Sequence, residues 1–306
     1  MLAWLTILLS LLNITNSILH LIGCYLLTSQ YNSGAQTPQQ VFLINISITE
    51  ASVNLLQLVL NHTYDTNISW LKHTLKYLKT VRGYGFVCVY FITMIYITLD
   101  RLFDILLNIK YPVYWNERRA IVLVLATWCV AQACAVGTCF LQHHAQVQVY
   151  DILELYVYPV FGILFIAIAT VTYVFIFRKY KQSCVPPVAR LSMCGDSLTS
   201  SLSTYQMFRK SRFYIPVLLI GTFIVFTAVP DLIQMTFVYL GYHNNIGVET
   251  LMRILWALSY LSDAFIYIWV KTSVRRLLKK KAYDVKRWIE DHRIKKNVMI
   301  EGEITH

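Results

Sequence analysis

Long apolar stretches separated by short polar segments are the main pattern along this chain. No Asp, Glu, Lys or Arg occurs before Glu50, and further uncharged runs cover 120–141, 155–177 and 213–230. Because an α-helix rises 1.5 Å per residue, about 20 residues are enough to cross a hydrocarbon core of about 30 Å. The pattern therefore predicts a polytopic membrane protein built of helices.

These stretches, and the turn signals between them, predict seven helices. They cover roughly 2–27, 39–61, 77–109, 119–141, 153–180, 210–240 and 249–271. A polar segment ending in Pro38, a residue suited to the start of a helix, separates the first two, and the longest loop covers 182–207. The predicted fold is an all-α membrane protein with a seven-transmembrane helix bundle in residues 1–272.

Residues 273–306 are predicted to form a basic cytoplasmic tail with an amphipathic helix after the seventh span. Leu277, Leu278 and Trp288 interleave with basic residues. This suits a helix lying on a membrane, with its basic side toward anionic lipid, so membrane lipids are expected partners. A solvated basic tail is the alternative for the part beyond Ala282.

Charge then predicts an orientation. Only 14% of the residues are charged, against about 25% in soluble domains, and the net charge is +11. The basic residues gather in a few loops and the tail, so topology explains this charge better than a nucleic-acid partner does. With the N-terminus extracellular and the C-terminus cytoplasmic, most of the 27 Lys and Arg residues lie inside. The segment 72–82 is a basic exception on the outside. The expected location is the plasma membrane.

Two sequons fall in the outer loop predicted between the second and third helices. Asn61 and Asn67 head them, and both are predicted glycosylation sites. Asn13 and Asn45 also head sequons, but they lie inside apolar runs and are expected to stay unmodified.

Several kinds of chemistry are not expected. The seven Cys lie mostly inside apolar runs, and their spacing suggests neither a metal site nor a disulfide framework. No cofactor is expected, and no nucleophile–base pair points to an enzyme. The apolar start is expected to be a signal-anchor helix rather than a cleaved signal peptide.

The acids inside or beside apolar stretches are the main functional candidates. They are Glu50, Asp100, Asp231 and Asp263. A charge at the centre of a spanning helix costs about 2.5–3.5 kcal/mol on insertion scales, so each needs a physical reason. The alternative is that Asp100 and Arg101 have no functional role and form a charge pair at the membrane interface that ends the helix. Glu50 and Asp263 would then form a hydrogen-bonded polar core that only fixes packing.

Three motifs in the predicted third, second and seventh helices resemble those of the rhodopsin-like (class A) G-protein-coupled receptors. Asp100-Arg101-Leu102, followed by Tyr111-Pro112-Val113, resembles the D-R-Y and later Y-P-V of that family. The segment from Asn45 to Glu50 resembles N-L-x-x-x-D, and Asp263 to Tyr267 resembles N-P-x-x-Y. The remaining predicted helices carry one landmark each: Asn16, Trp128, Pro159 and Pro230.

The chain departs from the family pattern at several positions, so it resembles a divergent member. Leu102 replaces the Tyr of D-R-Y, Ala228 stands where an aromatic residue is usual, and Ala264 replaces the Pro of the seventh helix. The usual disulfide between the third helix and the second outer loop has no Cys partners.

The resemblance implies a receptor that transmits an extracellular ligand signal to a cytoplasmic heterotrimeric G protein by helix rearrangement. The implied G-protein switch comprises Asp100, Arg101, Asp104 and Tyr267. Asp104 is close enough to pair with Arg101 along the helix. The implied polar core comprises Asn16, Asn45, Glu50 and Asp263, and the implied helix kinks are at Pro159 and Pro230.

A ligand pocket is expected in the outer half of the bundle, for an unknown small molecule or peptide. The candidates by helical position are Phe86, Val87, Tyr90, Tyr158, Asp231, Gln234, Trp256 and Tyr260. Gly83 stands where aminergic receptors carry an Asp, which disfavours a monoamine. Asp231 could neutralise a cationic ligand or pair with a neighbour such as Arg253.

Two other functions stay open. A seven-helix transporter could use the buried acids to carry protons or ions, although the internal repeats common in transporters are not seen. A non-signalling pseudo-receptor or scaffold would share the basic inner loops without activating a G protein.

Overall fold

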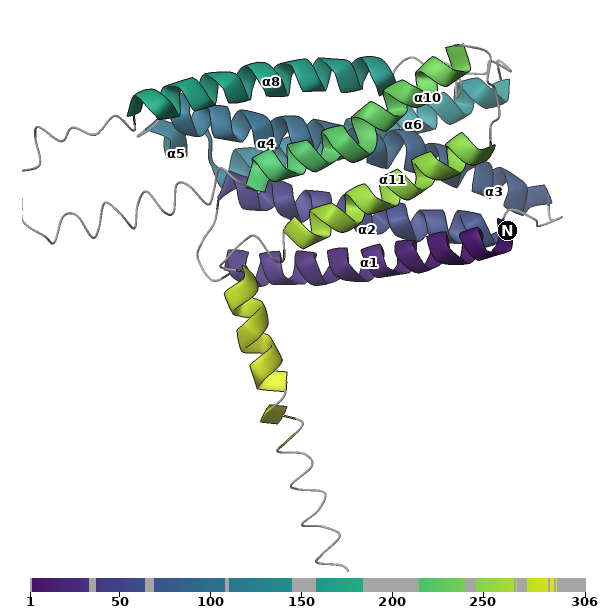
Figure 1. The fold of residues 1–306 in the computed structure, drawn as a ribbon, viewed down its shortest axis with the longest axis horizontal. Coiled ribbons are helices and arrows are strands. Elements are labelled where there is room, and N and C mark those ends of the chain that lie inside the picture. Colours follow the sequence, from purple (N-terminus) through teal and green to yellow (C-terminus); the bar gives the residue numbers. More distant parts are fainter. Residues whose placement is uncertain are drawn as a thin grey trace, which may run out of the picture.

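The computed structural model describes residues 2–32, 37–63, 69–107, 110–144, 158–183, 215–239, 246–266, 268, 274–285, 287–288 and 290. These residues are almost entirely helical, and no strand occurs among them. Figure 1 shows the long helices lying side by side in one bundle. The N-terminus lies at one end of the bundle, and the helix of residues 274–285 leaves from the opposite end.

The first half of the chain forms helices α1 (Leu2–Asn32), α2 (Pro38–Thr63), α3 (Ser69–Thr80), the π-helical segment η1 (Val81–Phe86) and α4 (Val87–Leu107). The short α5 (Tyr111–Tyr114) leads into α6 (Glu117–His144), which is followed by α8 (Tyr158–Ser183).

In the second half, helical residues 215–223 continue through the π-helical segment η4 (Ile224–Ala228) into α10 (Val229–Tyr239), and α11 covers Ile246–Phe265. Every predicted range therefore overlaps a helix.

Five helical segments are long and apolar enough to cross a membrane: Ile7–Gln30, Pro38–Leu60, Tyr77–Leu107, Glu117–Phe140 and Ile215–Phe237. The apolar part of α8, Gly162–Arg178, is shorter. The 20 residues of α11 include Glu249, Arg253 and Asp263, and α11 is not among these five segments. The structure thus supports a helical, membrane-embedded protein, while seven spanning helices remain a prediction.

The predicted third helix differs most from the observed one. It was expected as one helix over 77–109, but the helical chain already begins at Ser69 and contains the π-helical segment η1. The apolar pattern misses α3 because its sequence, SWLKHTLKYLKT, is amphipathic rather than apolar. Gly83 and Gly85 lie in η1, where their weak helix propensity is consistent with an irregular turn.

Gly85 allows η1 to approach α6 closely. A Cβ atom at Gly85 would lie 2.7 Å from Nε2 and 2.9 Å from Oε1 of Gln132, whereas a Cβ at Gly83 would meet nothing within 4 Å. We therefore expect Gly85→Ala to be less stable than the matched Gly83→Ala by about 1 kcal/mol, since the Gln132 amide must move aside. Thermal unfolding of the purified full-length variants measures the difference. Equal stabilities, or no recovery when Gln132→Ala is added to Gly85→Ala, would contradict this packing.

The predicted kink residues lie in different surroundings. Pro230 is the second residue of α10, just after η4, and Pro has no N–H to donate within a helix, so an irregular turn before it is physically expected. Tyr158 and Pro159 are the first described residues of α8. Their side chains, and the residues before them, lie outside the described part of the chain.

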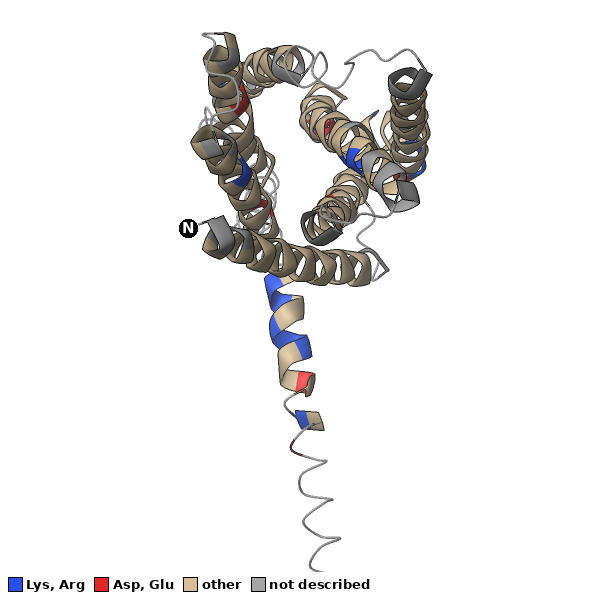
Figure 2. Cartoon of the chain, turned by 90° about the vertical axis from the view of Figure 1, so that its right-hand side faces the viewer, with Lys and Arg blue, Asp and Glu red and all other residues tan. Residues whose placement is uncertain are grey.

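The bundle buries its largest apolar side chains between helices and exposes many others on the outside. Phe42, Phe165 and Phe223 are almost fully buried. By contrast, Val171 and Phe177 of α8 are exposed by 70% and 61%. A soluble surface seldom presents so much apolar area, whereas hydrocarbon tails favour it. Figure 2 shows the bundle with few charged residues and the basic residues concentrated in the helix of residues 274–285.

The helix of residues 274–285 begins within the packed part of the protein and then leaves it. Val274 is fully buried, and Leu277 and Leu278 pack against the core. Lys281 places its Nζ atom 6.0 Å from the centre of the Tyr25 ring. Beyond this contact, Tyr283 and its neighbours are exposed, and the helix runs across the direction of the bundle (Figure 1). This direction is compatible with a helix lying along a membrane surface.

Candidate functional site

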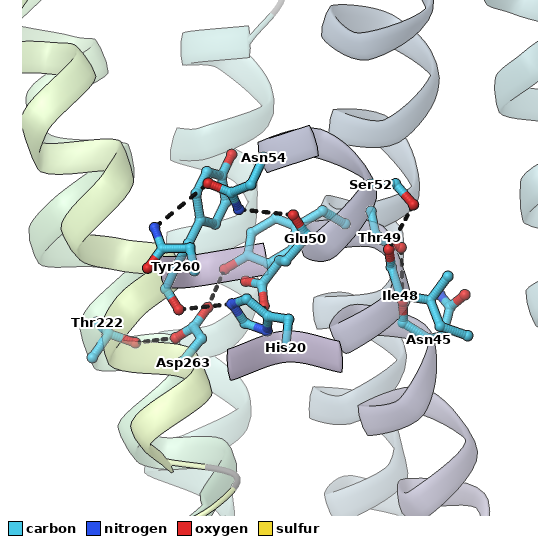
Figure 3. Close-up of polar contacts among 12 residues, drawn as sticks. His20, Asn45, Ile48, Thr49, Glu50, Ser52, Asn54, Thr222, Tyr260 and Asp263 are labelled. Carbon is cyan, nitrogen blue, oxygen red and sulfur yellow. Dashed lines mark hydrogen bonds and ion pairs between the residues drawn. The ribbon is translucent and has the colours of Figure 1, made fainter. Parts of the chain in front are cut away.

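Two carboxyl groups meet in the middle of the bundle. Glu50 of α2 and Asp263 of α11 are both fully buried. Asp263 accepts hydrogen bonds from the hydroxyls of Tyr90 and Thr222, each at 2.8 Å (Figure 3). Glu50 lies close enough to Asp263 to act on its carboxyl group (Figure 3). The site therefore connects α2, α4, α11 and the helix of residues 215–223.

His20 of α1 completes this central group. Its Nδ1 atom lies 3.1 Å from Oε2 of Glu50, and its Nε2 atom lies 2.9 Å from the backbone oxygen of Tyr260. Because a carbonyl oxygen can only accept, Nε2 carries a hydrogen and donates it. Figure 3 shows His20 lying between α2 and α11. We call His20, Glu50 and Asp263 the central group.

Asn16 is the residue of the first helix that was predicted to belong to the polar core. Asn16 is buried, but its Nδ2 atom donates to the backbone oxygen of Ala257 at 2.9 Å and lies 3.5 Å from Oδ1 of Asn54. The residue that contacts Glu50 lies one helical turn further on. A sequence signal existed, since His20 is the only His in the first 60 residues and stands in a long uncharged run.

Asn45 belongs to a different cluster from Glu50. Its Nδ2 atom donates to Oγ1 of Thr93 at 2.8 Å, and its Oδ1 atom accepts from Nε1 of Trp128 at 2.7 Å. These contacts tie α2 to α4 and α6. The four residues predicted as one polar core therefore lie in three separate settings, and only Glu50 and Asp263 come together.

A second charged cluster lies near the end of α4. The Arg101 guanidinium donates to Oδ2 of Asp100 through Nε at 3.0 Å and through Nη2. Its Nη1 atom lies 3.6 Å from Oδ2 of Asp104, one helical turn on. Asp100 is fully buried and Arg101 is only 5% exposed. The structure thus places three of the four predicted switch residues together, while Tyr267 lies outside the described residues.

Two aromatic side chains hold the other oxygen of Asp100. Tyr111 of α5 donates from its hydroxyl at 2.5 Å, and Trp115 donates from Nε1 at 2.8 Å. Burial raises the pKa of the Tyr111 hydroxyl far above its usual range, and the Asp100 carboxylate raises it further, so Tyr111 stays a donor. Trp115 also packs on Phe103, with ring centres 4.8 Å apart. Trp115 was missed because no charge marks it in the sequence.

A cavity adjoins the central group at Glu50. It is lined by Thr49, Glu50, Val53, Val87, Tyr90, Phe91, Thr227, Trp256 and Tyr260. Val87, Tyr90, Trp256 and Tyr260 were predicted as pocket residues. Glu50 was predicted only as part of the polar core. It belongs to both the cavity wall and the central group, so a change at one can reach the other directly.

The remaining pocket candidates are not among the lining residues of this cavity. Phe86 packs edge-to-face on Trp128, with ring centres 5.2 Å apart. Asp231 accepts a hydrogen bond from Nε1 of Trp256 at 3.1 Å, so it is fixed to the cavity wall from outside. Gln234 is half-buried on α10.

The side chains of the two predicted glycosylation sites lie outside the described part of the chain. Asn61 lies near the end of α2 with its side chain outside the described part of the chain, and Asn67 lies outside the described residues altogether.

Among the described residues, no group of three or more His, Cys, Asp and Glu side chains is placed to hold a metal ion. No protein-family model matches the chain, and no curated protein matches it.

Proposed function

We propose that the chain is a divergent rhodopsin-like G-protein-coupled receptor, which passes an extracellular ligand signal to a cytoplasmic heterotrimeric G protein. The observation that carries the proposal is the buried pairing of Arg101 with Asp100 near the end of a long apolar helix. A purely structural charge pair at a helix end would be expected to face water, because burying two ions is costly.

The pairing suits a switch with two states. In the resting state Asp100 and Asp104 hold the Arg101 guanidinium, and Tyr111 and Trp115 hold Asp100. On activation, the guanidinium leaves Asp100 and turns its fixed fork of donors toward backbone or carboxylate oxygens of the G protein. Because both states belong to one helix bundle, ligand binding and G-protein binding are coupled in both directions.

The cavity supports the other half of the proposal. Four of its nine lining residues are aromatic, and it adjoins Glu50 at the centre of the bundle. A ligand that enters from the extracellular side would change the packing of Tyr90 and Trp256 and so bias the helices between the two states. The proposal places the N-terminus outside the plasma membrane and the helix of residues 274–285 against its inner surface.

Replacement of Arg101 by Ala tests the proposal. We expect Arg101→Ala to lower basal or stimulated nucleotide exchange on a panel of G proteins at least about tenfold, the usual effect of losing a charged hydrogen-bonding anchor. Surface labelling of intact cells checks that the variant is still delivered. Arg118→Ala removes a neighbouring exposed basic residue and should signal as the wild type does.

Two results would contradict the proposal. Equal coupling of wild type and Arg101→Ala would reject the role of Arg101. A wild-type protein that reaches the surface but activates none of the G proteins would favour the non-signalling scaffold instead.

A further inference from the structure

The central group contains three titratable side chains with no solvent-exposed surface. His20, Glu50 and Asp263 are all fully buried, and they come from three different helices. The Arg101 switch described above uses none of them. Their hydrogen bonds decide where protons can be held.

The contacts of His20 leave one nitrogen for proton exchange. Nε2 keeps its hydrogen in every state because it donates to the Tyr260 backbone oxygen. Nδ1 faces Oε2 of Glu50 at 3.1 Å, a distance that needs one hydrogen between the two atoms. Either Glu50 donates to a neutral imidazole, or an imidazolium donates to the carboxylate, and the proton count is the same.

The contact between Glu50 and Asp263 needs a second proton. Two ionised carboxylates can only accept hydrogen bonds, and they repel each other when both are buried, so Glu50 and Asp263 can bond to each other only when one of them is protonated. Asp263 also accepts from Tyr90 and Thr222, which is the arrangement of an acceptor. Glu50 is therefore the member that exchanges hydrogens with both neighbours.

The net charge of the central group depends on how many protons it holds. With no added proton the central group is doubly negative, with one it is singly negative, and with two it is neutral. The neutral state fits the burial of all three side chains, since the Glu50–His20 contact and a Glu50–Asp263 hydrogen bond can then both form. Loss of one proton leaves either the Glu50–His20 or the Glu50–Asp263 contact without a hydrogen, and the paired atoms then repel in a medium of low dielectric.

We propose that His20, Glu50 and Asp263 form a proton-binding site whose occupancy holds α2 and α11 together. The proton is the ligand, and its loss drives Glu50 away from Asp263 or from His20. Because Asp263 is also bonded to Tyr90 and Thr222, the movement reaches α4 and the helix of residues 215–223. As a control of receptor activity, this site rests on the proposed function, but proton binding itself does not.

Other titratable groups surround the site and set its electrostatic field. Tyr260 and Tyr90 supply hydroxyls from α11 and α4. The charges of Arg82 in η1 and Asp231 in α10 act on Tyr260. Cys24 lies one turn beyond His20 on α1. Among these described neighbours Arg82 is the one permanent positive charge.

Infrared difference spectroscopy on the purified full-length protein tests the proposal without any G protein. Solvent-exposed carboxyls are ionised between about pH 6 and pH 9, so a protonated-carboxyl carbonyl band that disappears over this range reports a buried acid. We expect the wild type to show such a band. Glu50→Gln and Asp263→Asn keep the shape and hydrogen-bonding capacity of each side chain, and both variants should lose it.

The matched control is Glu117→Gln, the same chemical change in the first turn of α6, and it should keep the band. His20→Gln should shift the midpoint of the band by at least about one pH unit, a tenfold change in proton affinity, because it removes a proton-sharing partner. A purely structural hydrogen bond would give no band that titrates. Absence of the band in the wild type, or its full retention in both Glu50→Gln and Asp263→Asn, would overturn the proposal.

These outcomes separate the two proposals. A wild-type band with no G-protein coupling would keep the proton site and reject the receptor function. G-protein coupling without a titrating band would keep the receptor function and reject the proton site.

Discussion

Asp100→Ala is expected to destabilise the folded protein by about 3–5 kcal/mol, the cost of breaking a buried ion pair by removing one partner. The substitution leaves the Arg101 guanidinium buried and without its closest carboxylate. It also leaves the Tyr111 hydroxyl and the Trp115 indole N–H without the acceptor that they share. Chemical or thermal unfolding of the purified protein in detergent measures the loss.

Asp100→Asn removes the negative charge of this side chain and keeps its shape, so it separates the two contributions. The amide oxygen can still accept from Tyr111 and Trp115, so most of the stability should remain, but the carboxylate no longer holds Arg101. If the receptor proposal is right, this variant should signal more strongly without ligand than the wild type does. Asp104→Ala is the control, because that carboxylate is 31% exposed and 3.6 Å from the guanidinium, and its loss should cost less than about 1 kcal/mol. Similar losses for Asp100→Ala and Asp104→Ala would mean that Asp100 is not the main partner.

Phe223→Ala is expected to destabilise the protein by about 3–5 kcal/mol, the usual cost of a large-to-small change in a packed core. Phe223 is fully buried where three helical segments meet. Its ring centre lies 5.0 Å from that of Phe165, 5.1 Å from that of Phe91 and 5.9 Å from that of Tyr90. Alanine would leave a cavity facing all three rings, and they cannot collapse into it together.

Phe223→Leu should cost less than about 1.5 kcal/mol, since it keeps most of the volume. The matched control is Phe177→Ala on α8, where the side chain is 61% exposed on the outside of the bundle. That change should stay within about 0.5 kcal/mol, as surface substitutions usually do. Thermal unfolding of the three variants under one set of conditions gives the comparison. Equal losses for Phe223→Ala and Phe177→Ala would contradict the central position of Phe223.

The helices themselves were largely predictable because apolar runs of spanning length have few other uses. The ends of the helices were less predictable. The helical chain reaches back to Ser69 through an amphipathic segment, and the π-helical segment η4 interrupts regular geometry inside the uncharged run of 213–230. Hydrophobic periodicity reports burial, and it does not report a turn with one extra residue.

The candidate sites were predictable where a charge stands in an apolar run. Glu50, Asp100 and Asp263 stood out in this way, because an ion in hydrocarbon is costly enough to require a partner. The identity of each partner was not predictable. Trp115 is uncharged, and Asn16 and His20 lie on the same face of one helix, four residues apart, so the pattern does not say which of them meets Glu50.

Local sequence pattern determined the helical class, the apolar exterior and the pairing of Arg101 with Asp100 and Asp104, since these depend on residues within one or two helical turns. Only the tertiary structure decided that His20 meets Glu50, that Asn45 turns away to Thr93 and Trp128, and that Asp231 is held by Trp256. Such contacts join residues far apart in the chain. They depend on how each helix is rotated and shifted against its neighbours, and packing across the whole bundle sets that rotation.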